Sequence, residues 1–228
     1  MVDLSLVTAW IFSVMTSLFP PAMLAQQEVF IPEANESVAQ VEERYRGWSE
    51  AIAKEVYENG NTLYGGAEGK KKTVALVLAI MKYESGFRRD VDLGIGRERL
   101  AKIGWNDHGK SWCMMQINLG KKPYLRNGVW TEDSAINTEE GFSGRDLLAD
   151  RGKCVKAGIN ILRKSMSTCR HLPAKDWLRA YASGTCDNGG YQSESRMRLS
   201  WRILEKYSPN PRWKDKDYVL SSQLTALN

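Results

Sequence analysis

The sequence predicts a mainly α-helical protein built as a single globular domain. Apolar side chains recur at helical spacing over residues 38–56 and again over residues 193–207. Residues 74–81 form an uncharged run containing Ala, Leu and Met, which predicts a buried helix, and further helices are expected over 146–166 and 174–182. The stretches between them carry glycines typical of loops. With 228 residues, the chain is long enough for one good core and a small appendage.

Charge and composition narrow the classes of partner. Apolar residues make up 43% and charged residues 26% of the chain, which is ordinary for a globular protein. The formal net charge of +5 favours an anionic partner such as nucleic acid, a membrane surface or the bacterial wall. The basic residues are scattered, apart from the run 70–72, so we expect no nucleic-acid-binding stripe.

The N-terminal segment has the composition of an export signal. Residues 4–19 are almost uncharged and apolar, and small residues near Ala22 and Ala25 resemble a signal-peptidase site. We therefore interpret residues 1–25 as a signal peptide or an N-terminal anchor and residues 26–36 as a linker. Two alternatives to cleavage remain open, an uncleaved anchor in the inner membrane and a buried N-terminal helix. Membrane contact is expected only through residues 4–19.

The chain has four cysteines: Cys113, Cys154, Cys169 and Cys186. An even number behind an export signal predicts two disulfides in an oxidising compartment, the periplasm or the cell exterior. Of the three connectivities, we predict Cys113–Cys154 and Cys169–Cys186, the second closing a short loop around the helix expected at 174–182. No Cys-x-x-Cys pair occurs and the two histidines stand alone, so no metal site is predicted.

Glu84 is the leading candidate for a chemical role. The helix that begins in the apolar run is expected to end at Gly86, which places Glu84 in its last turn at the edge of a cleft. Glu84 shares a helical stripe with three apolar residues: Val77, Ile80 and Met81. A carboxylate held against apolar side chains has a raised pKa and can serve as a general acid. The alternative is a solvated or ion-paired residue beside Lys82 or Arg88.

Three segments, in order, carry a family resemblance. Residues 79–87, Ala-Ile-Met-Lys-Tyr-Glu-Ser-Gly-Phe, resemble the catalytic helix of the soluble lytic transglycosylases in the lysozyme-like superfamily. Residues 114–117, Met-Met-Gln-Ile, resemble that family's Gly-Leu-Met-Gln-Ile segment, and residues 180–184, Ala-Tyr-Ala-Ser-Gly, resemble its Ala-Tyr-Asn-x-Gly segment. Residues 154–162 match a fourth family helix in part. Cys113 stands where the family has Gly, and Ala182 where it has Asn.

The resemblance covers residues 70–207 and implies a mainly α, lysozyme-like (α+β) catalytic domain with a cleft, over residues 37–208, followed by a C-terminal tail, 209–228. It implies that Glu84 is catalytic. It further implies these substrate-binding residues: Ser85, Met115, Gln116, Asn118 and Tyr181.

The implied activity is that of a peptidoglycan lytic transglycosylase, a murein-degrading lyase of the cell wall. Its Glu protonates the oxygen of the MurNAc-GlcNAc β-1,4 bond and then takes the proton of the muramic acid C6 hydroxyl, which attacks C1 and gives a 1,6-anhydro product. No cofactor is expected, and the expected partners are glycan strands and a secretion or envelope complex. Two alternatives remain: a hydrolytic lysozyme using Glu84 with Asp92 or Asp107, and an inactive wall-binding module of a secretion or phage apparatus.

Overall fold

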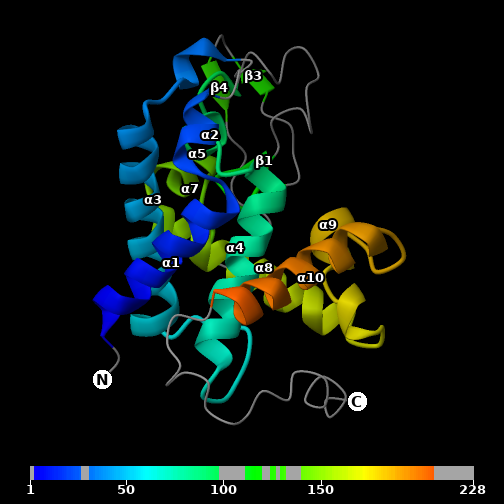
Figure 1. The fold of residues 1–228 in the computed structure, drawn as a ribbon. Helices are drawn as coiled ribbons and strands as arrows, with labels where there is room; N and C mark the ends of the chain where they lie inside the picture. Colours follow the sequence, from blue (N-terminus) through cyan, green and yellow to red (C-terminus); the bar gives the residue numbers. More distant parts are fainter. Residues whose placement is uncertain are drawn as a thin grey trace.

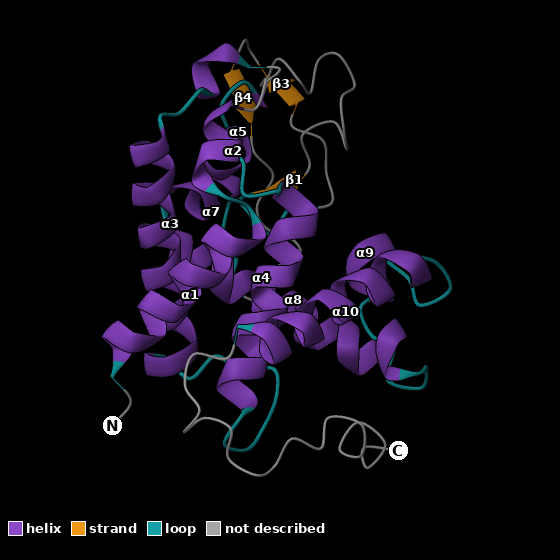
Figure 2. Cartoon of the chain, in the orientation of Figure 1, coloured by secondary structure: helices purple, strands orange, loops and turns teal. Residues whose placement is uncertain are grey.

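The protein is mainly helical, as the sequence predicts. A computed structural model describes residues 3–26, 31–97, 111–119, 124–126, 129–131 and 140–207. Helices make up most of this part of the chain, and its strands form two short antiparallel ribbons near one end (Figures 1 and 2). One hydrophobic core joins side chains from the N-terminal, central and C-terminal helices.

Helix α4 (Gly69–Ser85) lies at the centre of the fold. Its residues 73–81 are all buried, so the apolar run packs on every side, as expected for a core helix. The helix ends at Gly86, whose φ of 58° lies in the left-handed region that glycine adopts at helix ends. Helix α10 (Gly190–Lys206) packs along α4 (Figure 1). It brings the C-terminal part of the chain to the last turn of α4.

The N-terminal half of the chain forms a helical layer beside α4. Helices α1 (Leu4–Leu18) and α2 (Pro21–Gln26) pack against α3 (Val38–Ala53), and the 3-10 turn η1 (Pro32–Ala34) precedes α3. Ser37 and Gln40 form a capping box that starts α3. The predicted helical stripe continues beyond α3 into a π-helical turn, η2 (Lys54–Glu58).

The N-terminal segment is a helix with one face packed in the core, as in the third of the alternatives weighed for it. Its inward side chains are Val7, Trp10, Ile11, Val14 and Met15, all in the core. The Trp10 indole donates a hydrogen bond to the Tyr207 carbonyl, so α1 is tied to the end of α10. Among the described residues, no helix is long and apolar enough to cross a membrane.

The segment predicted as a linker is packed where the structure describes it. Ile31 and Ala34 are buried, and Ile31 lies against Gly96, where a side chain would clash with it. Glu36 forms an ion pair with Arg44 at 2.6 Å, and both side chains are almost fully buried. Residues 31–36 therefore belong to the domain, because their apolar and charged side chains find partners on it. Residues 27–30 and the predicted tail, 209–228, lie outside the described residues.

Short elements surround the end of α4. Helix α5 (Arg89–Leu93) follows it directly. Strands β1 (Ser111–Trp112) and β2 (Ile117–Asn118) form a tight hairpin in which Trp112 pairs with Ile117. A second ribbon joins β3 (Tyr124–Arg126) to β4 (Val129–Thr131).

The helix predicted over 146–166 is two helices, α7 (Gly144–Ala149) and α8 (Arg151–Thr168). Asp150 separates them because its backbone is extended and its carboxylate accepts hydrogen bonds from the N–H groups of Gly152 and Lys153, which caps α8. The helix predicted over 174–182 is likewise divided into a 3-10 turn, η3 (Ala174–Asp176), and a short helix, α9 (Arg179–Ser183).

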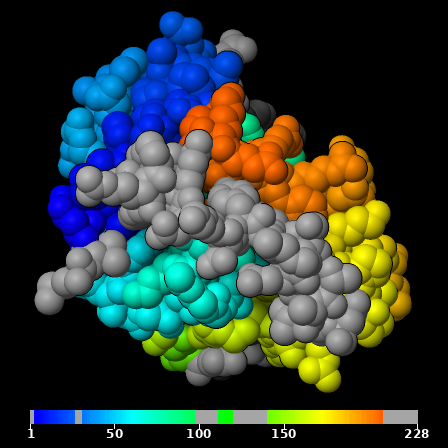
Figure 3. All heavy atoms as spheres, turned by 60° about the horizontal axis from the view of Figure 1, so that its bottom comes forward, coloured from blue at the N-terminus to red at the C-terminus, as the bar shows by residue number. Residues whose placement is uncertain are grey.

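Two disulfides connect these elements, with the connectivity predicted from the sequence. Cys113–Cys154 joins the hairpin to α8, and Cys169–Cys186 joins the end of α8 to the loop after α9. Both hold together the region that follows α4. In the space-filling view of Figure 3, the end of the last helix (red-orange) lies beside the N-terminal helices (blue).

Candidate active site

The last turn of α4 opens onto a cavity of about 640 Å³. Three segments that are far apart in the sequence supply its walls, namely the end of α4, the β1–β2 hairpin and α9. Five of the six predicted site residues line this cavity: Glu84, Ser85, Gln116, Asn118 and Tyr181. The N-terminal segment contributes Phe19, and Lys82 connects it to α4 by donating a hydrogen bond to the Leu18 carbonyl at 3.2 Å.

Glu84 is paired with an arginine from α10. Both Nε and Nη2 of Arg196 donate to Oε1 of Glu84, at 2.9 and 2.5 Å. The two side chains are 9% (Arg196) and 17% (Glu84) exposed, so the pair lies at the edge of the core with access to the cavity. Oε2 of Glu84 takes no hydrogen bond from the described residues and is not sealed from solvent.

Burial and Arg196 shift the pKa of Glu84 in opposite directions. Loss of water around the carboxylate raises its pKa above the ordinary value, while the charge and hydrogen bonds of Arg196 lower it, and the net direction is upward. The sequence-based expectation of a raised pKa agrees with this direction. Burial is the cause that the sequence analysis anticipated, and Arg196 acts in the opposite direction.

The hairpin presents Gln116 to the cavity through a strained turn. Cys113 and Gln116 have φ values of 56° and 50°, in the left-handed region that side chains other than Gly rarely adopt. The turn is closed by hydrogen bonds from the Gln116 backbone N–H, at 2.9 Å, and from its Nε2, at 3.1 Å, to the Cys113 carbonyl. The amide oxygen of Gln116 is thereby left for other partners.

Tyr181 lies beside Glu84, but its hydroxyl bonds elsewhere. Burial raises its pKa well above the ordinary value, and the charge of Glu84 raises it further, so the two groups are electrostatic neighbours. The hydroxyl donates a hydrogen bond to the Met115 carbonyl on the hairpin turn. The Tyr181 N–H donates to Ser165 Oγ on α8 at 2.9 Å. Tyr181 therefore ties α9, α8 and the hairpin together at the cavity.

Two of the residues predicted to bind substrate, Met115 and Ser85, make structural contacts. Met115 is fully buried and packs against Gly158 of α8, so its side chain lies in the core rather than on the cavity wall. Ser85 lines the cavity but is 4% exposed, and its hydroxyl donates to the Met81 carbonyl and accepts from the Phe87 N–H. This hydroxyl connects the last turn of α4 to the turn that follows it, because it bonds to Met81 in the helix and to Phe87 beyond it.

Arg196 is the polar residue that sequence reasoning missed. It precedes Met197, which the sequence places on the apolar face of the last helix, and it lies three, four and seven residues before the buried Leu199, Ser200 and Ile203. An arginine within a buried helical stripe requires a buried acceptor or counter-charge. That pattern was the available signal, although it does not identify Glu84 as the partner.

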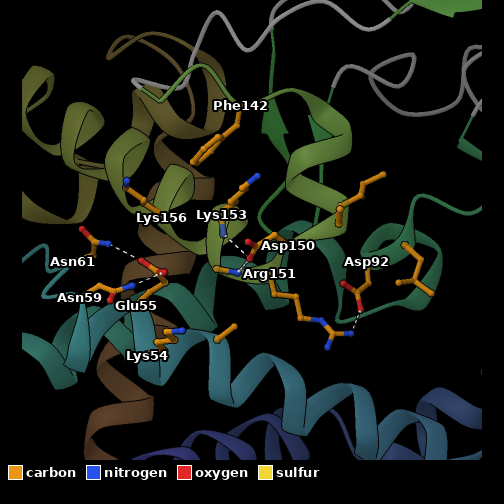
Figure 4. A pocket seen from close by; sticks show the side chains of 15 residues that line it. Lys54, Glu55, Asn59, Asn61, Asp92, Phe142, Asp150, Arg151, Lys153 and Lys156 are labelled. Carbon is orange, nitrogen blue, oxygen red and sulfur yellow. Dashed lines mark hydrogen bonds and ion pairs between the residues drawn. The ribbon is translucent and has the colours of Figure 1, made fainter.

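A second, larger cavity of about 960 Å³ is lined by residues of α3, η2, α5, α7 and α8 (Figure 4). It contains Asp92, one of the two carboxylates considered as a partner for Glu84 in hydrolysis. Asp92 is ion-paired with Arg151 at 3.2 Å and does not line the Glu84 cavity. The other candidate, Asp107, lies outside the described residues.

The remaining carboxylates of the second cavity have structural partners. Glu55 accepts hydrogen bonds from the side-chain amides of Asn59 and Asn61, at 2.8 and 2.7 Å (Figure 4). Asp150 caps α8, as described above. Each carboxylate among the described residues that line this cavity thus has a hydrogen-bond or ion-pair partner.

Within the residues that the structure describes, no three His, Cys, Asp or Glu side chains are grouped so that they could hold a metal ion. The described residues at the Glu84 cavity offer one carboxylate with neighbouring amide, phenol and guanidinium groups. Comparisons of the chain with protein-family models, with curated proteins and with solved structures find no match.

Proposed function

We propose that the protein is a peptidoglycan lytic transglycosylase, in which Glu84 acts as both the acid and the base. One observation carries the proposal: Glu84 is the single carboxylate among the described residues that line the cavity where the three motif segments meet. Hydrolysis with retention or inversion generally requires two carboxylates at the scissile bond. A transglycosylase requires one, because the substrate's own C6 hydroxyl replaces water as the nucleophile.

The surroundings of Glu84 suit this chemistry. Its raised pKa increases the fraction of protonated carboxyl that is ready to protonate the glycosidic oxygen. The carboxylate formed in that step then takes the C6 hydroxyl proton as C6–O attacks C1, which returns Glu84 to its starting state. In this scheme Gln116 and Asn118 bind sugar groups, and Tyr181 supports the side of the cavity next to Glu84.

The compartment follows from the cysteines. Two disulfides indicate an oxidising environment outside the reducing cytoplasm. We place the protein in the periplasm or at the cell exterior, where its substrate is found. A net charge of +5 favours association with the anionic wall.

The test is mass spectrometry of fragments released from purified wall sacculi. The wild-type protein should release muropeptides with 1,6-anhydro ends, and Glu84→Gln should reduce release by about 10⁴-fold or more, because one residue serves both proton transfers. Asp92→Asn is the matched control and should retain activity, since Asp92 lies in the other cavity. Reducing ends instead of anhydro ends would identify a hydrolase. Binding to sacculi without any release would identify an inactive wall-binding module.

A further inference from the structure

Arg196 reaches Glu84 with a fixed geometry. The long packing of α10 along α4 places the arginine opposite the last turn of α4. Its Nη1 donates to the Gln192 carbonyl at 2.9 Å, and its guanidinium lies 5.7 Å from the centre of the Tyr83 ring. The guanidinium is thus held by its own helix and by an aromatic neighbour, so it can orient the carboxylate that it contacts.

We propose that Arg196 is the positioning residue of the site: it occupies Oε1 of Glu84 with two N–H groups and thereby assigns proton transfer to Oε2. A guanidinium offers donors and no acceptor, so a hydrogen on Oε1 would face the N–H groups of Arg196. The protonated form of Glu84 therefore carries its hydrogen on Oε2, the oxygen that takes no bond from the described residues. This assignment rests on the proposed function of Glu84 as acid and base.

The other charged and titratable groups around Glu84 have different partners. Lys82 donates to the Leu18 carbonyl, and Arg88 is ion-paired with Asp90 at 3.2 Å. Tyr181, from α9, gives its hydroxyl hydrogen to the Met115 carbonyl. In the described part of the chain, Arg196 is therefore the cation that forms an ion pair with Glu84, and it opposes the effect of burial on the carboxyl.

Two substitutions separate charge from geometry. Arg196→Gln removes the positive charge, so the pKa of Glu84 should rise and the alkaline limb of the activity profile should move to higher pH. Arg196→Lys keeps a charge but loses the planar pair of donors, so kcat should fall by up to about 10²-fold while the alkaline limb moves much less than in Arg196→Gln. Arg198→Gln, on the exposed face of the same helix, is the matched control and should change neither property.

The carboxyl pKa of Glu84 is measured by ¹³C NMR on the full protein labelled at glutamate, with the signal assigned by its loss in Glu84→Gln. This reading needs no substrate, so it tests the role of Arg196 even if the wild-type protein releases no muropeptides and the proposed function fails. The idea is overturned if Arg196→Gln leaves the Glu84 pKa unchanged. It is also overturned if Arg196→Lys retains wild-type kcat, or if both variants change only the melting temperature, as a packing role requires.

Discussion

At the scale of a single residue, Cys113 both occupies the left-handed position of the hairpin turn and forms a disulfide. The sequence marked it as a departure from a family position occupied by Gly, and the structure gives its φ as 56°, a conformation that Gly adopts without strain. The disulfide to Cys154 holds the turn in place despite the side chain. The backbone shape that Gly would allow is therefore present here, and Gln116 reaches the cavity from it.

This reading predicts the outcome of a paired substitution. Replacing Cys113 and Cys154 removes the disulfide and should lower the free energy of unfolding by about 2–4 kcal/mol. The pair Cys113→Gly with Cys154→Ala should remain about 1 kcal/mol more stable than Cys113→Ala with Cys154→Ala, because Gly relieves the left-handed strain. Urea unfolding of both variants measures the difference. A more stable Ala pair would show that the turn changes shape without the disulfide.

At the site, the sequence was a better guide to which residues line the cavity than to what each of them contacts. Glu84, Gln116, Asn118 and Tyr181 line one cavity, although they come from segments that are far apart in the sequence. The contacts of Met115 and Ser85 depend on a neighbouring helix and on a local turn, which no spacing rule specifies. Arg196 was missed for the same reason, since its partner lies on another helix.

At the scale of elements, some helix boundaries could be predicted from the sequence and others could not. The start of α3 and the end of α4 were predictable, because Ser37 and Gly86 are strong capping signals. The break between α7 and α8 was not predicted, although residues 150–153 carry no apolar side chain. It depends on the Asp150 carboxylate, which caps α8 in place of a continuing helix.

The N-terminal helix gives a direct test at the same scale. Ile11 is fully buried, whereas Leu6 on the same helix is 61% exposed. If α1 is part of the folded domain, Ile11→Ala should lower the free energy of unfolding by about 2–5 kcal/mol. Leu6→Ala should change it by less than about 0.5 kcal/mol. Both are measured on protein whose intact N-terminus is verified by mass spectrometry, and equal stability of the two variants contradicts the observed packing of α1.

The contact between α8 and the hairpin requires a glycine, Gly158, which has no side chain. A Cβ added at Gly158 would lie 2.2 Å from Sδ of Met115, which is fully buried. Gly158→Ala should therefore cost about 1–3 kcal/mol through overpacking. In a Met115→Ala background the same substitution should be neutral or stabilising, because Ala favours a helix and the clash is gone. Thermal unfolding of the four proteins gives the coupling, and additive effects would show that the helix and the hairpin do not meet there.

At the scale of the whole molecule, the two disulfides and the carboxylates of Glu84 and Asp92 act on stability in different ways. The disulfides were predictable because the pairing that closes local segments is also the pairing that the fold allows. The ion pairs Glu84–Arg196 and Asp92–Arg151 were not predictable, since each joins residues more than fifty positions apart. These pairs make stability depend on pH.

Burial raises the pKa of both Glu84 and Asp92, with Arg196 and Arg151 respectively as the main opposing charges. A raised pKa means that the folded state binds the proton more tightly than the unfolded state. The stabilisation that each group contributes is therefore complete below its unfolded pKa, near 4. It is lost as pH rises through the higher folded value.

Comparison with matched variants isolates this dependence from other groups, because the pKa of Asp146 is lowered to about 2 and acts in the opposite direction. Glu84→Gln resembles the protonated acid and can still accept a hydrogen bond from Arg196, so it should gain stability relative to wild type as pH rises from about 4 to neutrality. Glu84→Met removes the acceptor and leaves the buried guanidinium unpaired, which should cost about 1–3 kcal/mol at every pH. Urea unfolding of the three proteins at several pH values measures both effects. A Gln variant that loses stability relative to wild type as pH rises would show that Arg196 outweighs burial at this site.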